Sequence, residues 1–144
     1  MCEQIKISKI EHLKMIEDII TRMANNSFLV KGWTVTLIAA LLIFADAKNN
    51  ICFIWIAIIP IIVFWYLDSF YLQLERKYRQ LYSFVQQDYI NIVKPDYKEQ
   101  VPLFNMSTEN VKVTNIVRIM FSKSIIPIYS TILIVTLIIY FINC

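Results

Sequence analysis

Glycine, histidine and charge are all scarce in this chain of 144 residues, which has one Gly, one His and 17% charged residues. A single glycine excludes the glycine-rich loops that cradle phosphates and dinucleotides. The cysteines at positions 2, 52 and 144 form no CxxC pair, so no zinc or iron–sulfur site is expected. Hydrophobic residues make up 58% of the chain, above the 45–50% or so of soluble domains. The composition indicates one small integral membrane domain, an all-α membrane protein spanning residues 1–144.

Three apolar stretches carry this hydrophobicity. Residues 28–47 contain only Lys31 as a charge before Asp46, and residues 51–67 are uncharged. Residues 124–144 are uncharged over 21 positions, about 31 Å as a helix, which matches a hydrocarbon core of about 30 Å. The sequence predicts three transmembrane helices, the first two joined as a tight hairpin. A hairpin of two buried helices in a soluble protein is the alternative for that pair.

The distribution of Lys and Arg predicts the orientation. Five lie before the first span or near its start, where Lys31 is the fifth, eight lie between the second and third spans, and the hairpin tip holds only Lys48. Because cytoplasmic loops carry the excess of positive charge, we expect the N-terminus and the middle segment to be cytoplasmic, in a bacterial inner membrane. The hairpin tip and the C-terminus then lie outside, as an odd number of spans requires.

Residues 8–25 are predicted to form an N-terminal cytoplasmic amphipathic helix. Ser8 and Glu11 have the spacing of a capping box, and Asn25-Asn26-Ser27 is expected to end the helix and cap the first span. Its apolar positions recur three and four apart: Ile10, Leu13, Ile16, Ile20 and Met23. Because its polar face mixes both signs of charge, we expect it to pack on the other cytoplasmic helix.

The second span is predicted to continue as a long cytoplasmic stalk helix over residues 68–93. Apolar side chains continue the helical spacing, and neither Gly nor a second Pro interrupts the chain between Pro60 and Pro95. Residues 94–106 contain two prolines and are predicted to be a linker. Residues 107–123 are predicted to be an interfacial amphipathic helix that leads into the third span.

The sequence contains few candidate catalytic residues. No Ser or Cys lies in a recognisable nucleophile motif, and His12, on a helix rich in Lys and Glu, is expected to be a solvated surface histidine. We therefore predict no enzyme activity, no cofactor and no metal.

The polar residues inside the spans are the candidate pore or interface residues. On the third span they form one stripe, and Thr36 of the first span pairs with Ala40 at small-xxx-small spacing. The candidates are Tyr129, Thr136, Tyr140, Asn143 and Thr36. Packing within one subunit is the alternative to a subunit interface or a pore wall. Lys31 and Asp68 lie at equal depth, where they either form an ion pair or extend separately to the headgroups.

The stalk carries two further candidate sets. A seam of period 3.5 is suited to joining subunits, or to packing on the N-terminal helix of the same subunit. Its residues are Tyr71, Leu74, Tyr78, Leu81 and Val85. Beside it, Arg76, Lys77 and Arg79 are candidates for binding a regulatory nucleotide or oligonucleotide, although basic residues on this side are also what the topology requires.

Three stretches of the sequence carry a family resemblance. The run from Asn26 to Leu37 (NSFLVKGWTVTL), with FWYLD at 64–68 and LERKYRQLY at 74–82, resembles the SLATT-type membrane effectors of bacterial anti-phage loci and the channel subunits of Hailong-type systems. The resemblance covers about residues 10–90, and the third span departs from the SLATT pattern. It implies a triggered oligomeric pore that disrupts the membrane or its potential, and a co-encoded nucleotidyltransferase whose nucleotide or oligonucleotide product regulates it.

The sequence therefore predicts a channel-forming effector of abortive infection, with the lipid bilayer and further copies of itself as partners. Three spans enclose little space, so conduction requires a homo-oligomer, a tetramer or larger. A non-conducting scaffold or anchor that recruits a cytosolic partner is the alternative. Cys52 and Cys144 are placed near the same outer interface, where a disulfide between them is possible but not required.

The predicted topology can be tested with the native cysteines. After mild reduction, a membrane-impermeant maleimide added to intact spheroplasts should label Cys52 or Cys144 and spare Cys2, because only the outer side is accessible. Labelling is read by mass spectrometry, and permeabilised cells provide the control. Labelling of Cys2 alone would invert the topology.

Overall fold

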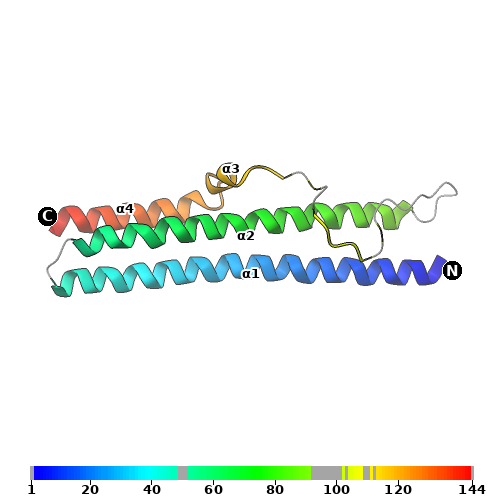
Figure 1. Cartoon of the computed structure of the whole chain (residues 1–144), viewed down its shortest axis with the longest axis horizontal. Helices are drawn as coiled ribbons and strands as arrows, with labels where there is room; N and C mark the ends of the chain where they lie inside the picture. Colours follow the sequence, from blue (N-terminus) through cyan, green and yellow to red (C-terminus); the bar gives the residue numbers. More distant parts are fainter. Residues whose placement is uncertain are drawn as a thin grey trace. The chain divides into compact units, whose positions relative to one another are not determined.

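The computed structural model describes residues 2–48, 52–91, 102, 104–108, 111 and 113–143, with side chains described from 4–45, from 56–91 and from the later residues up to 141. The four helices of this part are α1 (Cys2–Lys48), α2 (Cys52–Asn91), α3 (Ile116–Met120) and α4 (Ile126–Asn143) (Figure 1). No strand occurs in these ranges. The expected all-helical class is confirmed.

α1 is one unbroken helix of 47 residues. The break expected at Asn25-Asn26-Ser27 is wrong, and so is the helix start expected at Ser8. Asn and Ser cost a helix interior less than Gly or Pro, and the Ser27 hydroxyl donates to Asp68 instead of capping a helix end. The continuous backbone also keeps every N–H and C=O paired along the apolar segment.

α2 is likewise continuous over 40 residues and contains Pro60. Proline removes one backbone donor, a loss that apolar helices packed against neighbours tolerate. The predicted continuity of the second apolar stretch with the helix after it is therefore what the structure has.

In the part of the chain that the structure describes, two helices are long and apolar enough to cross a membrane, α1 within Gln4–Ala45 and α2 within Ile56–Asn91. In each helix, 22% of the most apolar stretch of 18 residues is buried inside the chain. The core helix of a soluble protein would be mostly buried. The apolar part of α4, Ile126–Phe141, is shorter.

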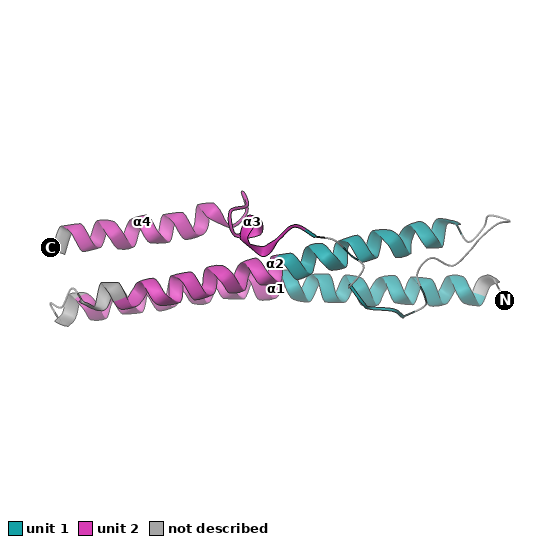
Figure 2. Cartoon of the chain, turned by 45° about the horizontal axis from the view of Figure 1, so that its top comes forward, with its two compact units in different colours: residues 1–24, 73–113 teal, residues 25–72, 114–144 magenta. Residues whose placement is uncertain are grey.

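The chain divides into two compact units, coloured separately in Figure 2. Unit 1 contains residues 1–24 and 73–113, and unit 2 contains residues 25–72 and 114–144. Each unit takes one part of α1 and one part of α2, which run antiparallel because a short connection joins them. The two units are described separately below.

Unit 1 has a small apolar core. Ile16 of α1, Leu81 and Val85 of α2, and Val111 are buried together. Partly buried side chains surround them: Leu13, Ile20, Tyr78, Tyr82, Met106 and Val113. The chain after α2 therefore returns over the helix pair, and its described residues 104–108, 111 and 113 are called the return segment below.

The interfacial helix expected over residues 107–123 is wrong for the residues described there. Among the residues described in that range only α3, five residues long, is helical, and a turn separates it from α4. Met106, Val111 and Val113 pack on the core of unit 1, and a single amphipathic helix along a membrane surface would not bury them there. The rest of the expected linker 94–106 lies largely outside the described residues.

Unit 2 brings α4 against α2. The Tyr129 hydroxyl donates to the Phe64 carbonyl at 3.1 Å, and the Trp65 indole donates to the Met120 carbonyl at 3.0 Å. Later residues of α4 face earlier residues of α2, since Leu133 and Thr136 line one pocket with Ile58 and Ile61. The apolar parts of α2 and α4 are therefore antiparallel.

The core of unit 1 yields a stability prediction. Leu81→Ala should lower the free energy of unfolding by about 2–5 kcal/mol, because Leu81 is 5% exposed and leaves a cavity. Phe84→Ala, at a position 52% exposed three residues along the same helix, is the matched control and should cost much less. Chemical denaturation in detergent, followed by circular dichroism, measures both. Equal losses would contradict the assigned core.

Candidate functional site

A cluster of polar side chains lies among the apolar helices of unit 2, centred on Asp68 of α2. Lys31 of α1 contacts the Asp68 carboxylate, with 2.6 Å between Nζ and Oδ1. Ser27, one turn earlier on α1, donates its hydroxyl to the same Oδ1 at 2.5 Å and accepts from Lys31 Nζ at 2.7 Å. The three side chains thus form a closed triangle that joins α1 to α2.

The structure decides between the two arrangements that the sequence leaves open for Lys31 and Asp68. They form an ion pair in which the Lys31 side chain is 22% exposed and the Asp68 side chain is fully buried. A buried carboxylate is strongly disfavoured unless it is paired, which explains why Lys31 turns toward Asp68.

α4 closes the cluster from a third side. Tyr129 is buried, and its hydroxyl lies beside Thr34 and Asp68 as well as the Phe64 carbonyl. Its ring stacks on Trp65, with 5.8 Å between centroids and 9° between planes. Trp65 in turn meets Phe121 edge to face. The aromatic stack fixes the start of α4 against the cluster.

One acceptor of the cluster is unsatisfied. Asp68 Oδ2 is buried and has no hydrogen-bond partner among the described residues. The Tyr129 hydroxyl, which donates to the Phe64 carbonyl, also lies beside the Asp68 carboxylate. The arrangement offers a carboxylate, an ammonium and three hydroxyls in a place with little water, a combination suited to binding and moving protons or to setting the packing of three helices.

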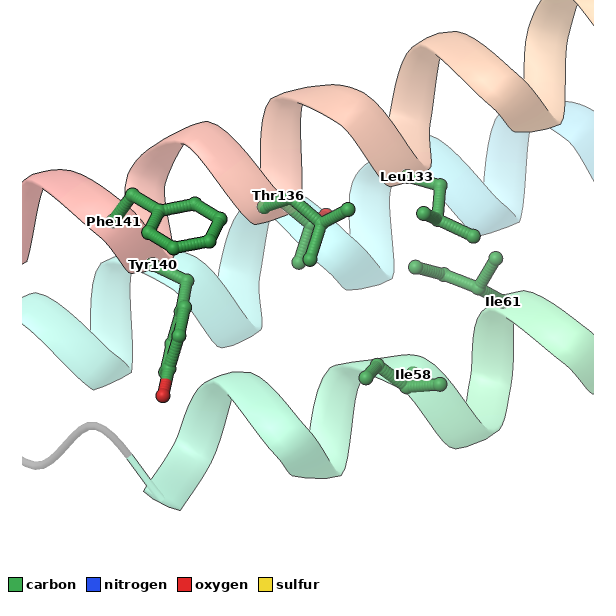
Figure 3. Close-up of a pocket in the computed structure, with 7 residues that line it drawn as sticks. Ile58, Ile61, Leu133, Thr136, Tyr140 and Phe141 are labelled. Atoms are coloured by element: carbon green, nitrogen blue, oxygen red, sulfur yellow. The ribbon is translucent and has the colours of Figure 1, made fainter. Parts of the chain in front are cut away.

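The stripe of the third span packs within the chain. Thr136 is 2% exposed, and its hydroxyl donates to the Ile132 carbonyl at 2.8 Å. Tyr140 is half-buried at one end of a wholly apolar pocket of about 240 Å³ between α2 and α4 (Figure 3). With Tyr129 buried as well, the described stripe residues match the packing alternative and not a free pore wall. The side chain of Asn143 lies outside the described residues, as do those of Cys52 and Cys144.

Thr36 alone of the described pore candidates lies on an exposed face. Its hydroxyl donates to the Gly32 carbonyl of its own helix at 3.0 Å. A Cβ added at Gly32 would meet nothing within 4 Å. This side of α1 is therefore open in a single copy of the chain.

Part of the stalk seam packs against other residues of unit 1. Leu81 and Val85 are buried against Ile16, and Tyr78 packs on the same core, so the structure shows the same-subunit alternative for these three. Tyr71 and Leu74 are half-buried. Leu81 and Val85 are not available to join subunits without opening that core.

The candidate regulator-binding residues lie on one turn of α2. Arg76 and Lys77 are half-buried, and Arg79 is exposed and bonds Glu75 with 2.8 Å between Nε and Oε1. An exposed pair at this spacing contributes little stability, so the Arg79 guanidinium can exchange Glu75 for an anion at small cost.

Unit 1 contains a second polar centre that the sequence analysis missed. Lys9 of α1 and Asp88 of α2 are both buried, with 2.6 Å between Nζ and Oδ2. His12 is also fully buried, which overturns the expected surface histidine. Its ring lies 5.9 Å from the ring of Phe104 in the return segment.

A signal for this centre was present in the sequence. Asp88 continues the seam of Leu81 and Val85 at the next spacing of three. Lys9, His12 and Ile16 follow one another at spacings of three and four on one face of α1. Charged residues at core positions of two seams indicate a buried pair.

In the described ranges no group of three or more His, Cys, Asp or Glu is arranged to hold a metal ion. No protein-family model matches the chain, and neither a curated protein nor a solved structure matches it. The site must therefore be interpreted from its own geometry.

The cluster gives a prediction about energetics. Lys31→Met should lower the free energy of unfolding by about 3 kcal/mol, because it leaves the Asp68 carboxylate buried and unpaired. The double variant Lys31→Met/Asp68→Leu should recover most of this loss, since it removes both charges.

The exposed pair on α2 is the matched control. Glu75→Gln removes the Arg79 contact, where the Arg79 side chain is 63% exposed, and should cost less than about 1 kcal/mol. Denaturation in detergent micelles measures all three variants. A double variant as unstable as Lys31→Met would show that the pair's charges are not what holds the helices.

Proposed function

We propose that this chain is an integral membrane protein of the bacterial inner membrane that crosses the bilayer three times and assembles into an oligomeric channel. It acts as the effector of an anti-phage system and disrupts the membrane or its potential when triggered. The observation that carries the proposal is the charged Lys31–Asp68 pair set among helices whose outer surfaces are apolar.

The membrane location is supported by what unit 2 exposes. Large apolar side chains point outward from both long helices, including Phe28, Leu29, Trp33, Ile43 and Phe44 on α1. Ile56, Ile59, Ile62 and Val63 do the same on α2. A soluble protein rarely leaves so large a contiguous apolar surface in water, whereas lipid covers it at no cost.

Three crossings are supported by the length and direction of α4. Its 18 residues reach about 27 Å, close to a hydrocarbon core of about 30 Å. It runs antiparallel to the apolar part of α2, as the next crossing would. With the charge asymmetry of the sequence, this supports a cytoplasmic N-terminus and an outer C-terminus.

A role beyond anchoring is supported by the polar cluster. Ionisable side chains at membrane depth are costly and usually serve transport or gating. An anchor needs neither a buried carboxylate with an unsatisfied oxygen nor a lysine turned inward to meet it.

The proposal of an oligomer is supported by the geometry of one copy. The described polar stripe of α4 is turned inward, so a single unit 2 offers no continuous polar surface. A conducting path needs several copies, a tetramer or larger, and the open side of α1 at Gly32 and Thr36 is where neighbours can approach closely. The regulator class, a nucleotide or oligonucleotide from a co-encoded nucleotidyltransferase, rests on the SLATT-type resemblance alone.

The alternative is a non-conducting scaffold that recruits a cytosolic partner. Its supporting observation is that the seam residues Tyr78, Leu81 and Val85 pack within one copy, as the stripe residues Tyr129 and Thr136 do.

Membrane potential separates the two functions. Induced expression in a bacterial host should collapse the potential, followed with a voltage-sensitive dye, and the purified protein should release a small dye from liposomes. Asp68→Asn should alter the release rate, since it changes the charge at the cluster, whereas Glu75→Gln should not. A folded, inserted protein that leaves both the potential and the liposomes intact would reject the channel and favour the scaffold.

A further inference from the structure

The chain bends just before α4, and this bend is held against α2. α3 and the turn that follows it, residues 116–125, are called the elbow below. Backbone hydrogen bonds within the elbow close the turn, and Ile119 and Ile125 are fully buried. The Trp65 indole donates to the Met120 carbonyl at 3.0 Å. The elbow is therefore a packed part of unit 2.

The outer side of the elbow combines apolar and positively charged side chains. Val117 and Phe121, four residues apart, are 60% and 61% exposed. Arg118 and Lys123 are exposed as well, and no carboxylate among the described residues pairs with either of them. The sequence contains no acidic residue after Glu109. The elbow thus presents two cations beside two uncovered apolar side chains.

The elbow lies at the level of exposed aromatic side chains on both long helices. Its bond to Trp65 fixes that level on α2, where the neighbouring Tyr66 is exposed. On α1, the exposed Phe28 and Trp33 lie within one turn of Lys31, whose ion-pair partner follows Trp65 by three residues. Aromatic side chains gather where a bilayer meets water. This level, directly before the apolar helix α4, is therefore that of the lipid headgroups.

The exposed side chains favour a lipid over a free anion. A soluble phosphate would use Arg118 and Lys123 but would leave Val117 and Phe121 in water. A phospholipid offers a phosphate to the cations and acyl chains to the apolar pair. Anionic lipids of the cytoplasmic leaflet attract basic residues beside a membrane span, which gives the charge complementarity that a neutral lipid lacks.

We propose that the elbow is a binding site for an anionic phospholipid of the cytoplasmic leaflet. Arg118 and Lys123 bind the headgroup phosphate, and Val117 and Phe121 contact the upper part of the acyl chains. The inference rests on the membrane location and orientation given under the proposed function, and it stands whether or not the protein conducts. A bound lipid would hold the inner end of α4 against α2, because the elbow connects to both.

Trp65 is a native reporter for this site, since its indole bonds the elbow and its ring meets Phe121 edge to face. Replacing Trp33 and Trp55 with phenylalanine leaves Trp65 as the only tryptophan of the full chain. The protein in neutral detergent micelles is then titrated with phosphatidylglycerol or with phosphatidylcholine, and the Trp65 emission is followed. The emission should respond to phosphatidylglycerol at a lower lipid fraction than to phosphatidylcholine.

Two double variants identify the residues responsible. A basic residue near a membrane surface contributes about fivefold to the affinity for anionic lipid, so Arg118→Gln/Lys123→Gln should weaken phosphatidylglycerol binding by roughly 25-fold. Binding of phosphatidylcholine should not change. Lys6→Gln/Lys14→Gln removes the same charge from α1 in unit 1 and should leave both affinities unchanged.

Glycerol phosphate, which carries the phosphate without acyl chains, should not displace the lipid. Equal affinity for the two lipids, equal losses in the two double variants, or displacement by glycerol phosphate would each overturn the proposal. Extraction of cell membranes with alkaline carbonate separates this failure from that of the proposed function. A chain that stays in the membrane and shows no lipid preference overturns the elbow site alone, whereas a chain that is washed off overturns both.

Discussion

Charge buried among apolar helices is the constraint on which the rest of this structure depends. The Asp68 carboxylate has no access to water, so its position is tolerable only with the Lys31 ammonium and the Ser27 hydroxyl on the facing helix. Those contacts set which turn of α1 lies against which turn of α2. Apolar side chains alone would permit several such alignments, because sliding one helix along the other by one turn replaces one apolar contact with another.

Lys9 and Asp88 act in the same way in unit 1. Each unit therefore has one lysine on α1 and one aspartate on α2, in contact at 2.6 Å. A shift of either helix by one turn would leave two buried charges unpaired, a penalty of several kcal/mol for each. Buried polar residues specify the register of coiled coils by this mechanism, usually at some cost in stability.

The two units use this pairing toward different ends. Unit 2 surrounds its pair with tyrosine, threonine and tryptophan from three helices, and leaves apolar side chains outside. That surface is suited to lipid or to further copies of the chain, which is why we propose a membrane oligomer. Unit 1 surrounds its pair with a small apolar core and a return segment, and contains the buried His12.

The sequence by itself determined the helical class, the two long apolar helices and the unbroken passage of α2 from apolar to amphipathic segments, because helical periodicity and proline placement are local properties. It also identified Lys31 and Asp68 as matched in depth. It did not anticipate the continuity of α1 through Asn25-Asn26-Ser27. The Ser27 hydroxyl can cap a helix end or bond Asp68, and Asp68 comes within its reach only when α2 packs against α1.

Only the tertiary structure decided what the seams and stripes contact. Leu81 and Val85 have the same spacing whether they face a neighbour or α1, and Thr136 is equally polar on a pore wall or inside a helix pair. The contact of His12 with Phe104 and the burial of Val111 in one core with Ile16 bring together residues more than 90 positions apart in the chain. Periodicity specifies which side of a helix is apolar, but the identity of the surface it meets is fixed by long-range packing.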